Sequence, residues 1–194
     1  TAIELGGQDA KVIFFRYDEA AKQLVASDMR MNGSCAGGTG AFIDQIAELL
    51  NIRTEEFEAL ASKGTTLYDI SGRCGVFAKT DIQPLLNQGV SKADLALSSL
   101  HAIAKQTIGG LAQGMEINAP VIFEGGPLTF IPTLVKVFRE RLELHEESDA
   151  LRPEGAEILI ARGAALSIGT LHRNEPCRYQ GLETLEGFEE RVKE

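Results

Sequence analysis

TAIELGGQDAKVIFFR, residues 1–16, is the stretch that decides how this chain folds. Its two apolar runs, residues 1–5 and 11–16, are predicted strands, and the Gly-Gly-Gln-Asp sequence at residues 6–9 is a strong turn signal between them. Residues 23–29 (QLVASDM) indicate a third strand after a further turn. We therefore expect the chain to begin with three short strands in an antiparallel meander.

Beyond the meander, apolar residues recur at helical spacing in several segments. Helices are predicted at residues 41–50, at residues 80–86, at residues 92–113 with Ser91 as N-cap, at residues 130–142, at residues 157–171, and after Thr54 as N-cap, with extended chain at residues 67–71 and a strand at residues 120–123. Residues 145–155 are charged and expected to be irregular. Residues 1–171 are thus the expected folded domain, and the polar residues 172–194 are an expected linker or tail.

Composition excludes several classes of protein. The 194 residues carry 19 Lys and Arg against 28 Asp and Glu, and this acidic surface disfavours general nucleic-acid binding. No run of about 18 apolar residues is present to span a membrane. The first 30 residues lack the pattern of a signal peptide, so a reducing cytoplasm is expected. Because residue 1 is Thr rather than Met, we expect this chain to be a piece of a longer one.

The turn after the first strand has the composition of an anion site. Gly6 and Gly7 allow backbone N–H groups to approach a bulky anion closely. Glu4, at the end of the strand, is a candidate magnesium ligand, directly or through water. Gln8 is a candidate for orienting an attacking water. The alternative is an ordinary Gly-Gly hairpin turn with solvated polar residues.

Two of the three cysteines lie in glycine-rich loops. Cys35 precedes Ala-Gly-Gly-Thr-Gly and a helix, whose N-terminal field favours the thiolate form, and Cys74 lies in Arg-Cys-Gly. Cys35 and Cys74 are too far apart in the sequence to form the closely spaced cysteine pair of a zinc finger. An iron–sulfur cluster usually takes four thiolates, which two chains with two each would supply across a two-fold axis. The alternative is that both cysteines are small buried residues, and Cys177 in the tail is interpreted as a bystander.

A second Gly-Gly pair, Gly125 and Gly126, follows the strand at residues 120–123 in the sequence FEGGPL. A strand that ends in Gly-Gly before a helix often seats a flat ring or a phosphate, but it also often merely turns the chain. Further on, ARGAAL at residues 161–166 allows close helix packing and indicates no chemistry by itself.

In this order, ELGGQDAK, CAGGTGAF, RCGVFAKTD, FEGGPL and ARGAAL resemble the BadF/BadG/BcrA/BcrD ATPases over residues 1–171. This family includes activators of 2-hydroxyacyl-CoA dehydratases and ATPase subunits of benzoyl-CoA reductases. The stretch CGVFAKTDIQPLLNQG is most similar to very large activase-related proteins that carry such modules in tandem.

The resemblance implies an α/β fold: the second subdomain of the acetate and sugar kinase/heat-shock chaperone/actin architecture, a mixed sheet with helices and nucleotide in the cleft between subdomains. Gly6, Gly7 and Gln8 match the family's second phosphate motif. Gly125 and Gly126 match its adenosine motif. The implied nucleotide is ATP or ADP with Mg²⁺. Cys35 and Cys74 match the two cysteines that bind a 4Fe–4S cluster shared between two subunits.

The sequence departs from the family at three points. The first phosphate motif, of Asp-x-Gly-x-Thr type, is absent, so ATP hydrolysis is expected only when an upstream subdomain completes the site. Glu4 stands where the family has Asp, which lengthens the side chain by about 1.5 Å. Pro127 removes one N–H group after the second Gly-Gly pair.

The resemblance thus implies an ATP-dependent activator module that passes an electron to a CoA-thioester dehydratase or reductase. Its partner across the cluster is an identical chain or a second module of the same polypeptide. Two alternatives stay open, namely a nucleotide-binding domain without redox chemistry and an assembly domain of a large multidomain protein.

Overall fold

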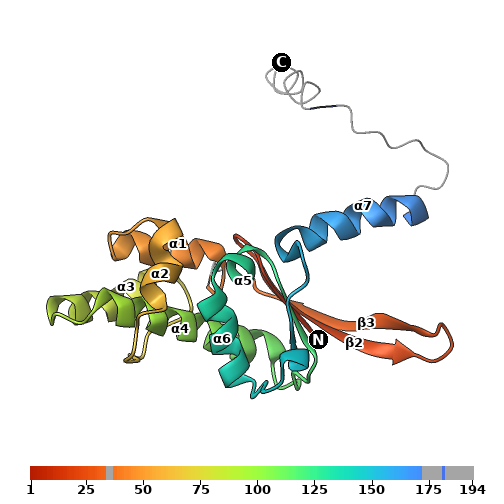
Figure 1. Ribbon diagram of the computed structural model, residues 1–194, viewed down its shortest axis with the longest axis horizontal. Helices are drawn as coiled ribbons and strands as arrows, with labels where there is room; N and C mark the ends of the chain where they lie inside the picture. Colours follow the sequence, from red (N-terminus) through yellow and green to blue (C-terminus); the bar gives the residue numbers. More distant parts are fainter. Residues whose placement is uncertain (34–36, 172–180, 182–194) are drawn as a thin grey trace. The chain divides into compact units, whose positions relative to one another are not determined.

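The computed structural model of the chain describes residues 1–33, 37–171 and 181 (Figure 1). The chain divides into two compact units, Thr1–Leu159 and Ile160–Glu194. The first unit holds the sheet and all helices up to residue 158. Of the second unit, the structure describes residues 160–171, which belong to α7 (Leu159–Leu171), and residue 181. No helix within the described ranges is long and apolar enough to cross a membrane.

A mixed five-stranded sheet organises the first unit, as the resemblance implies. The strands are β1 (Ala2–Leu5), β2 (Ala10–Asp18), β3 (Gln23–Met31), β4 (Val121–Glu124) and β5 (Ala150–Leu151), in the order β3-β2-β1-β4-β5. β1, β2 and β3 pair antiparallel, which confirms the expected meander. β4 pairs parallel with both β1 and β5, so residues distant in sequence meet at one end of β1.

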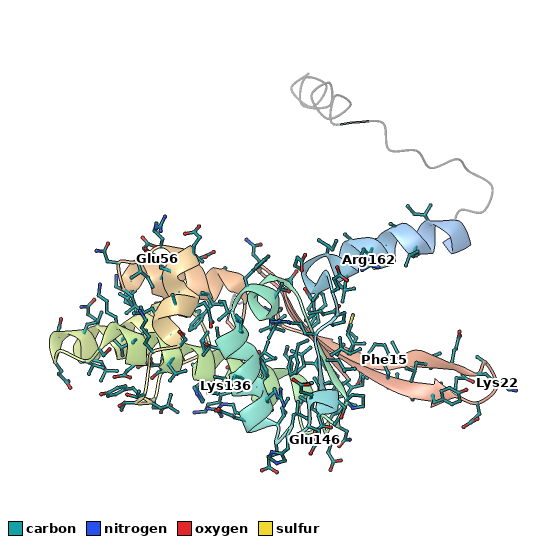
Figure 2. All side chains as sticks on the ribbon, in the orientation of Figure 1. Phe15, Lys22, Glu56, Lys136, Glu146 and Arg162 are labelled. Carbon is teal, nitrogen blue, oxygen red and sulfur yellow. The ribbon has the colours of Figure 1, made fainter. Side chains whose placement is uncertain are left out.

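The β2–β3 hairpin is longer than expected and extends away from α1, α2 and α3 (Figure 1). The register shifts between Phe14 and Phe15. Before the shift Phe14 is buried, whereas beyond it Phe15 and Tyr17 are exposed. Figure 2 shows Phe15 partway along the hairpin and Lys22 near its tip. The inner half of the hairpin therefore belongs to the core and the outer half is a free ribbon.

Six helices in the described part of the first unit pack with the sheet and with one another, and they are numbered in chain order. They are α1 (Gly40–Leu49), α2 (Phe57–Ala61), α3 (Gly75–Asn87), α4 (Lys92–Ala112), α5 (Gly126–Phe130) and α6 (Pro132–Arg141), with short 3-10 turns at Thr54–Glu56, Glu147–Asp149 and Ala156–Ile158. α4 packs against α2 and α6 and also contacts β2. Phe123 of β4 and Phe138 of α6 meet in this core with ring centroids 5.7 Å apart.

Four sequence-based boundaries are wrong. Arg53 rather than Thr54 is the N-cap of the 3-10 turn, because the Thr54 hydroxyl donates to Asp44 instead. α3 begins at Gly75, five residues earlier than expected. The helix expected at residues 130–142 begins at Pro132 as α6, and a separate short helix, α5, precedes it.

The fourth error is β5, which lies within the segment expected to be irregular. The remaining extended segment, residues 67–71, joins no strand. Its backbone N–H groups at Tyr68 and Ser71 bond instead to side chains of Ser98 and Asp81. The Ser91 N-cap is confirmed, since its hydroxyl accepts from the N–H of Ala93 at 3.2 Å.

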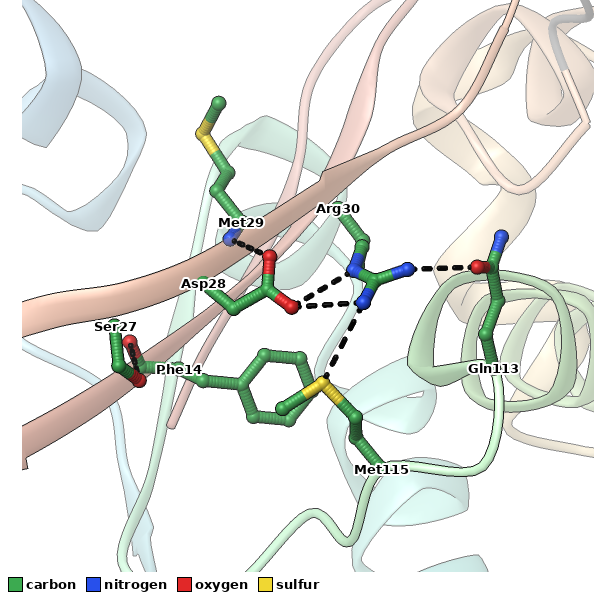
Figure 3. A network of polar contacts seen from close by, with 7 residues as sticks. All are labelled: Phe14, Ser27, Asp28, Met29, Arg30, Gln113 and Met115. Atoms are coloured by element: carbon green, nitrogen blue, oxygen red, sulfur yellow. Dashed lines mark hydrogen bonds and ion pairs between the residues drawn. The ribbon is translucent and has the colours of Figure 1, made fainter.

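A polar network fastens β3 to the end of α4 (Figure 3). The Arg30 guanidinium donates to Asp28 through two nitrogens, at 3.0 and 2.8 Å. Its Nη1 donates to the Gln113 side chain at 2.8 Å, and its Nη2, which also donates to Asp28, lies 3.9 Å from the sulfur of Met115. Gln113 is the left-handed C-cap of α4, so this network fixes where the helix ends relative to the hairpin.

Candidate functional site

The Gly6–Asp9 turn between β1 and β2 is closed by one internal hydrogen bond, and its other backbone N–H groups are available to a ligand. The N–H of Gly6 donates to the carbonyl of Asp9 at 2.8 Å. Gly7, Gln8 and Asp9 are exposed, and their N–H groups have no acceptor among the described residues. A methyl group at Gly7 would meet nothing within 4 Å. Successive unpaired N–H groups of this kind form a concavity suited to an anion.

α1 begins directly on this turn. The N–H of Gly40 donates to the carbonyl of Gly6 at 2.9 Å, and the N–H of Ala41 donates to that of Gly7 at 2.7 Å. These bonds satisfy two of the donors that a helix N-terminus normally leaves unpaired. A Cβ at Gly40 would lie 3.3 Å from the Cα of Gly7, a tight contact. The turn and the first residues of the helix are therefore directly joined.

Beneath the turn, two buried carboxylates lie side by side. Glu4 and Glu124 are partners in the parallel pairing of β1 and β4, and they are 6% and 8% exposed. Lys11, opposite Glu4 on β2, places its Nζ 2.6 Å from Glu4 Oε2. Burial and the neighbouring charge of Glu4 raise the pKa of Glu124. Lys11 thus neutralises the carboxylate that the sequence indicates as a magnesium ligand.

The second Gly-Gly pair lies at the end of β4, beside β1. Gly125 has φ of +94°, and a Cβ there would lie 2.7 Å from the carbonyl carbon of Leu5. Only glycine fits such a close approach of two backbones. Gly126 follows as the first residue of α5. Both sequence-predicted glycine motifs are therefore brought to the same end of the sheet.

A cavity of about 560 Å³ lies between the two motifs. Its lining comes from Gly7 of the turn, from α1, from the Thr54–Glu58 stretch and from α5 with the residue after it. The wall is mostly apolar, with Ile43, Pro127 and Phe130 among its residues. The size and the mixture of apolar wall and backbone donors are typical of a small-molecule site. Gly7 and Gly126 line this cavity, whereas Glu4, Gly6, Gln8 and Gly125 are not among its lining residues.

The sequence reasoning missed most of the cavity wall. Ile43 and Asp44 on α1, and Glu55 and Glu58 beyond it, also line the cavity. Glu58 is held by Thr133, whose N–H and hydroxyl donate to its two oxygens at 3.2 and 2.8 Å. The acidic first turn after Thr54 was a visible signal, but only helix packing shows that it faces a cavity.

Cys74 is half-buried and is the N-cap of α3, with no disulfide bond. The next N–H, that of Gly75, donates to the side chain of Gln45 on α1 at 3.0 Å. A cavity of about 410 Å³ lies beside Cys74, and Gly37 and Phe77 are among its lining residues. A Cβ at Gly37 would lie 2.6 Å from the Arg73 carbonyl carbon, so the backbones of the two cysteine loops touch.

The other two cysteines, Cys35 and Cys177, lie outside the described residues. Within the described ranges, no three His, Cys, Asp or Glu side chains gather in an arrangement that would hold a metal ion. Cys74 is the described part of the proposed ligand set.

The chain is similar in sequence to a known protein family and to characterised proteins. The sequence profile of the BadF/BadG/BcrA/BcrD ATPase family matches residues 1–149. The (R)-2-hydroxyglutaryl-CoA dehydratase activating ATPase of Acidaminococcus fermentans is 33% identical over 126 residues, which are 65% of this chain and 46% of that protein. The chain thus spans about half the length of this curated relative.

Two solved structures share the fold. The crystal structure of the A. fermentans (R)-2-hydroxyglutaryl-CoA dehydratase component A superposes with a TM-score of 0.72 at 30% identity, covering 86% of this chain and 60% of that one. The activator of the 2-hydroxyisocaproyl-CoA dehydratase from Clostridium difficile, with bound ADPNP, also gives 0.72 at 23% identity, covering 93% and 65%. The first unit therefore has the α/β, actin-like fold of these activators.

Proposed function

This chain belongs to the BadF/BadG/BcrA/BcrD ATPase family, and from that membership we propose that it is one half of an ATP-dependent activator. In this proposal it binds ATP or ADP with Mg²⁺ and, together with a second copy or a tandem module, holds a 4Fe–4S cluster. The acceptor of its electron is a CoA-thioester dehydratase or reductase.

The nucleotide part rests on the fit of the cavity. Phosphates would lie at the Gly6–Asp9 turn, where the N–H groups of Gly7 and Gln8 have no acceptor among the described residues. The adenosine end would lie against Gly126 and the apolar wall of α5. Gln8 is exposed and follows Gly7 in the turn, and in this proposal it orients the attacking water. Charge on the transferred phosphoryl group needs donors on all sides, which a second subdomain supplies.

The single observation that carries the activator role is the pair of backbone bonds from Gly40 and Ala41 to the phosphate turn, at 2.9 and 2.7 Å. The helix bonded to the turn is the helix that follows the Cys35 loop. The same helix reaches Cys74, because Gln45 accepts from the N–H of Gly75. A displacement of the turn by nucleotide would therefore be transmitted through α1 to both cysteine loops.

The cluster part rests on the donor set and on loop contact. Gly37, two residues after Cys35, lies against the Arg73 carbonyl, one residue before Cys74. Cysteine sulfur is the usual protein ligand of iron–sulfur clusters. When bound, the cluster supplies one-electron transfer. Two thiolates per chain are half of the usual four, so Cys35 and Cys74 of two copies or modules would share one cluster.

One observation favours a second candidate, a nucleotide-binding domain that does not hydrolyse ATP. Glu4 lies in an ion pair with Lys11 at 2.6 Å and is buried. A carboxylate already neutralised by a lysine is a weak magnesium ligand. Measurement of ATP hydrolysis by the protein at its natural length separates the candidates, because only the activator hydrolyses ATP.

Calorimetry with ATP on the protein at its natural length tests nucleotide binding. Gly7→Asp places a negative charge among the phosphates, whereas Gly7→Ser adds a neutral side chain of similar reach. We expect Gly7→Asp to weaken ATP binding by at least tenfold relative to Gly7→Ser, as like charges at this distance repel. Absence of ATP binding by the unmodified protein would refute the proposal.

A further inference from the structure

Phe130 stands out because a large aromatic side chain is exposed at the wall of the cavity. It is the last residue of α5 and is 68% exposed. The reason lies in helix geometry. α5 points Leu128, which is 0% exposed, and the following Ile131, at 7%, into the core. Phe130 falls between these positions and is directed outward.

The ring lies over the second glycine motif. A Cβ at Gly126 would find the Cδ2 atom of Phe130 as its nearest neighbour, at 4.0 Å. Both residues line the 560 Å³ cavity, and Ile43 of α1 lines it too. Among the described residues Phe130 has no aromatic partner. An exposed aromatic ring of this kind in a cavity wall provides a face on which another flat ring can stack.

Charge decides which end of a nucleotide meets this ring. Asp44, Glu55 and Glu58 line the same cavity as Phe130 and give its wall three carboxylates. Asp44 lies one helical turn, about 6 Å, beyond Gly40 along α1. Phosphates are repelled by carboxylates and favoured at the Gly7 end, where backbone N–H groups are available. A nucleotide would therefore lie with its uncharged base towards Phe130.

We propose that Phe130 stacks on the nucleobase and is the residue by which this site favours nucleotides over phosphate chains without a base. The inference rests on the proposed function, since it concerns the same cavity. Base–aromatic stacking tolerates different bases, because every base has a π-face. The ring is carried by a short helix that the buried side chains of Leu128 and Ile131 anchor in the core.

Calorimetry with two probes tests this role in the protein at its natural length. ATP carries a base, and inorganic tripolyphosphate does not. We expect Phe130→Ala to weaken ATP binding about tenfold, which corresponds to 1.4 kcal/mol, while tripolyphosphate binding stays unchanged. Phe130→Tyr keeps a ring and should retain the affinity for ATP. Phe130→Leu keeps apolar area without a ring and should lose it.

Phe15→Ala is the matched control, since it removes an exposed phenyl ring from the β2–β3 hairpin, far along the chain from the cavity wall. It should leave both affinities unchanged. Equal ATP affinity in the unmodified protein and Phe130→Ala would overturn the inference, as would an equal loss of ATP and tripolyphosphate binding. An unmodified protein that binds neither probe would instead overturn the proposed function itself.

Discussion

Gly125→Ala should destabilise the first unit strongly, because it forces a side chain into the contact between β4 and β1. Gly125 has φ of +94°, a region that costs residues other than glycine about 1–3 kcal/mol. The new Cβ would lie 2.7 Å from the Leu5 carbonyl carbon, whereas ordinary contact begins at 3.4 Å. Relief of this overlap must open the β1–β4 pairing. We expect a total cost of about 4 kcal/mol.

Thermal denaturation followed by circular dichroism measures this cost. For a unit of this size, about 4 kcal/mol corresponds to a melting temperature roughly 10 °C lower. Gly89→Ala separates the two contributions, since Gly89 has φ of +81° but nothing within 4 Å of a Cβ. It should cost only about 1–2 kcal/mol. Gly7→Ala should have the same melting temperature as the unmodified protein, because a Cβ at Gly7 meets nothing within 4 Å. If Gly125→Ala did so as well, the close backbone approach would be refuted.

Three further variants test the ion pair and a helix cap. Lys11→Met leaves the Glu4 carboxylate buried beside Glu124 without a cation, and we expect chemical denaturation to show a loss of about 3 kcal/mol. Burial and the charge of Glu4 raise the pKa of Glu124 above its ordinary 4.5. The folded state therefore binds this proton more tightly than the unfolded state does. As a result, the free energy of unfolding falls as the pH rises from 4.5 through the raised pKa. Glu124→Gln should therefore melt above the unmodified protein at pH 7 and with it at pH 4; equal melting temperatures at pH 7 would contradict this. Ser91→Ala removes the acceptor for the N–H of Ala93 and should cost about 1 kcal/mol in the same denaturation assay.

Local patterns in the sequence predict most of the fold. The β1–β3 meander and α4 are correct, because alternating apolar residues, a Gly-Gly turn and a serine cap are local signals. β5 was missed because its two residues become a strand only by pairing with β4. The start of α3 was missed because its first residue is glycine, a poor helix former, and its N–H is satisfied by the distant Gln45.

In the candidate site, too, local features could be predicted from the sequence and long-range ones could not. Both glycine motifs could be recognised in the sequence, since each follows a strand. Their meeting at one cavity depends on the parallel pairing of β1 and β4, which no local pattern reveals. The pairing of Glu4 with Lys11 follows from the register of the hairpin, and a four-residue turn at residues 6–9 would have predicted it. Phe130 was expected to begin the helix at residues 130–142, whereas it is the last residue of α5.

Iron content after anaerobic reconstitution tests the central claim most directly, namely that Cys35 and Cys74 hold a cluster shared by two copies or modules. The unmodified protein and Cys177→Ser should be brown, with broad absorbance near about 400 nm and about two irons per chain. Cys35→Ser and Cys74→Ser should each lose both the colour and the iron. Full iron in either of these two variants would contradict the account.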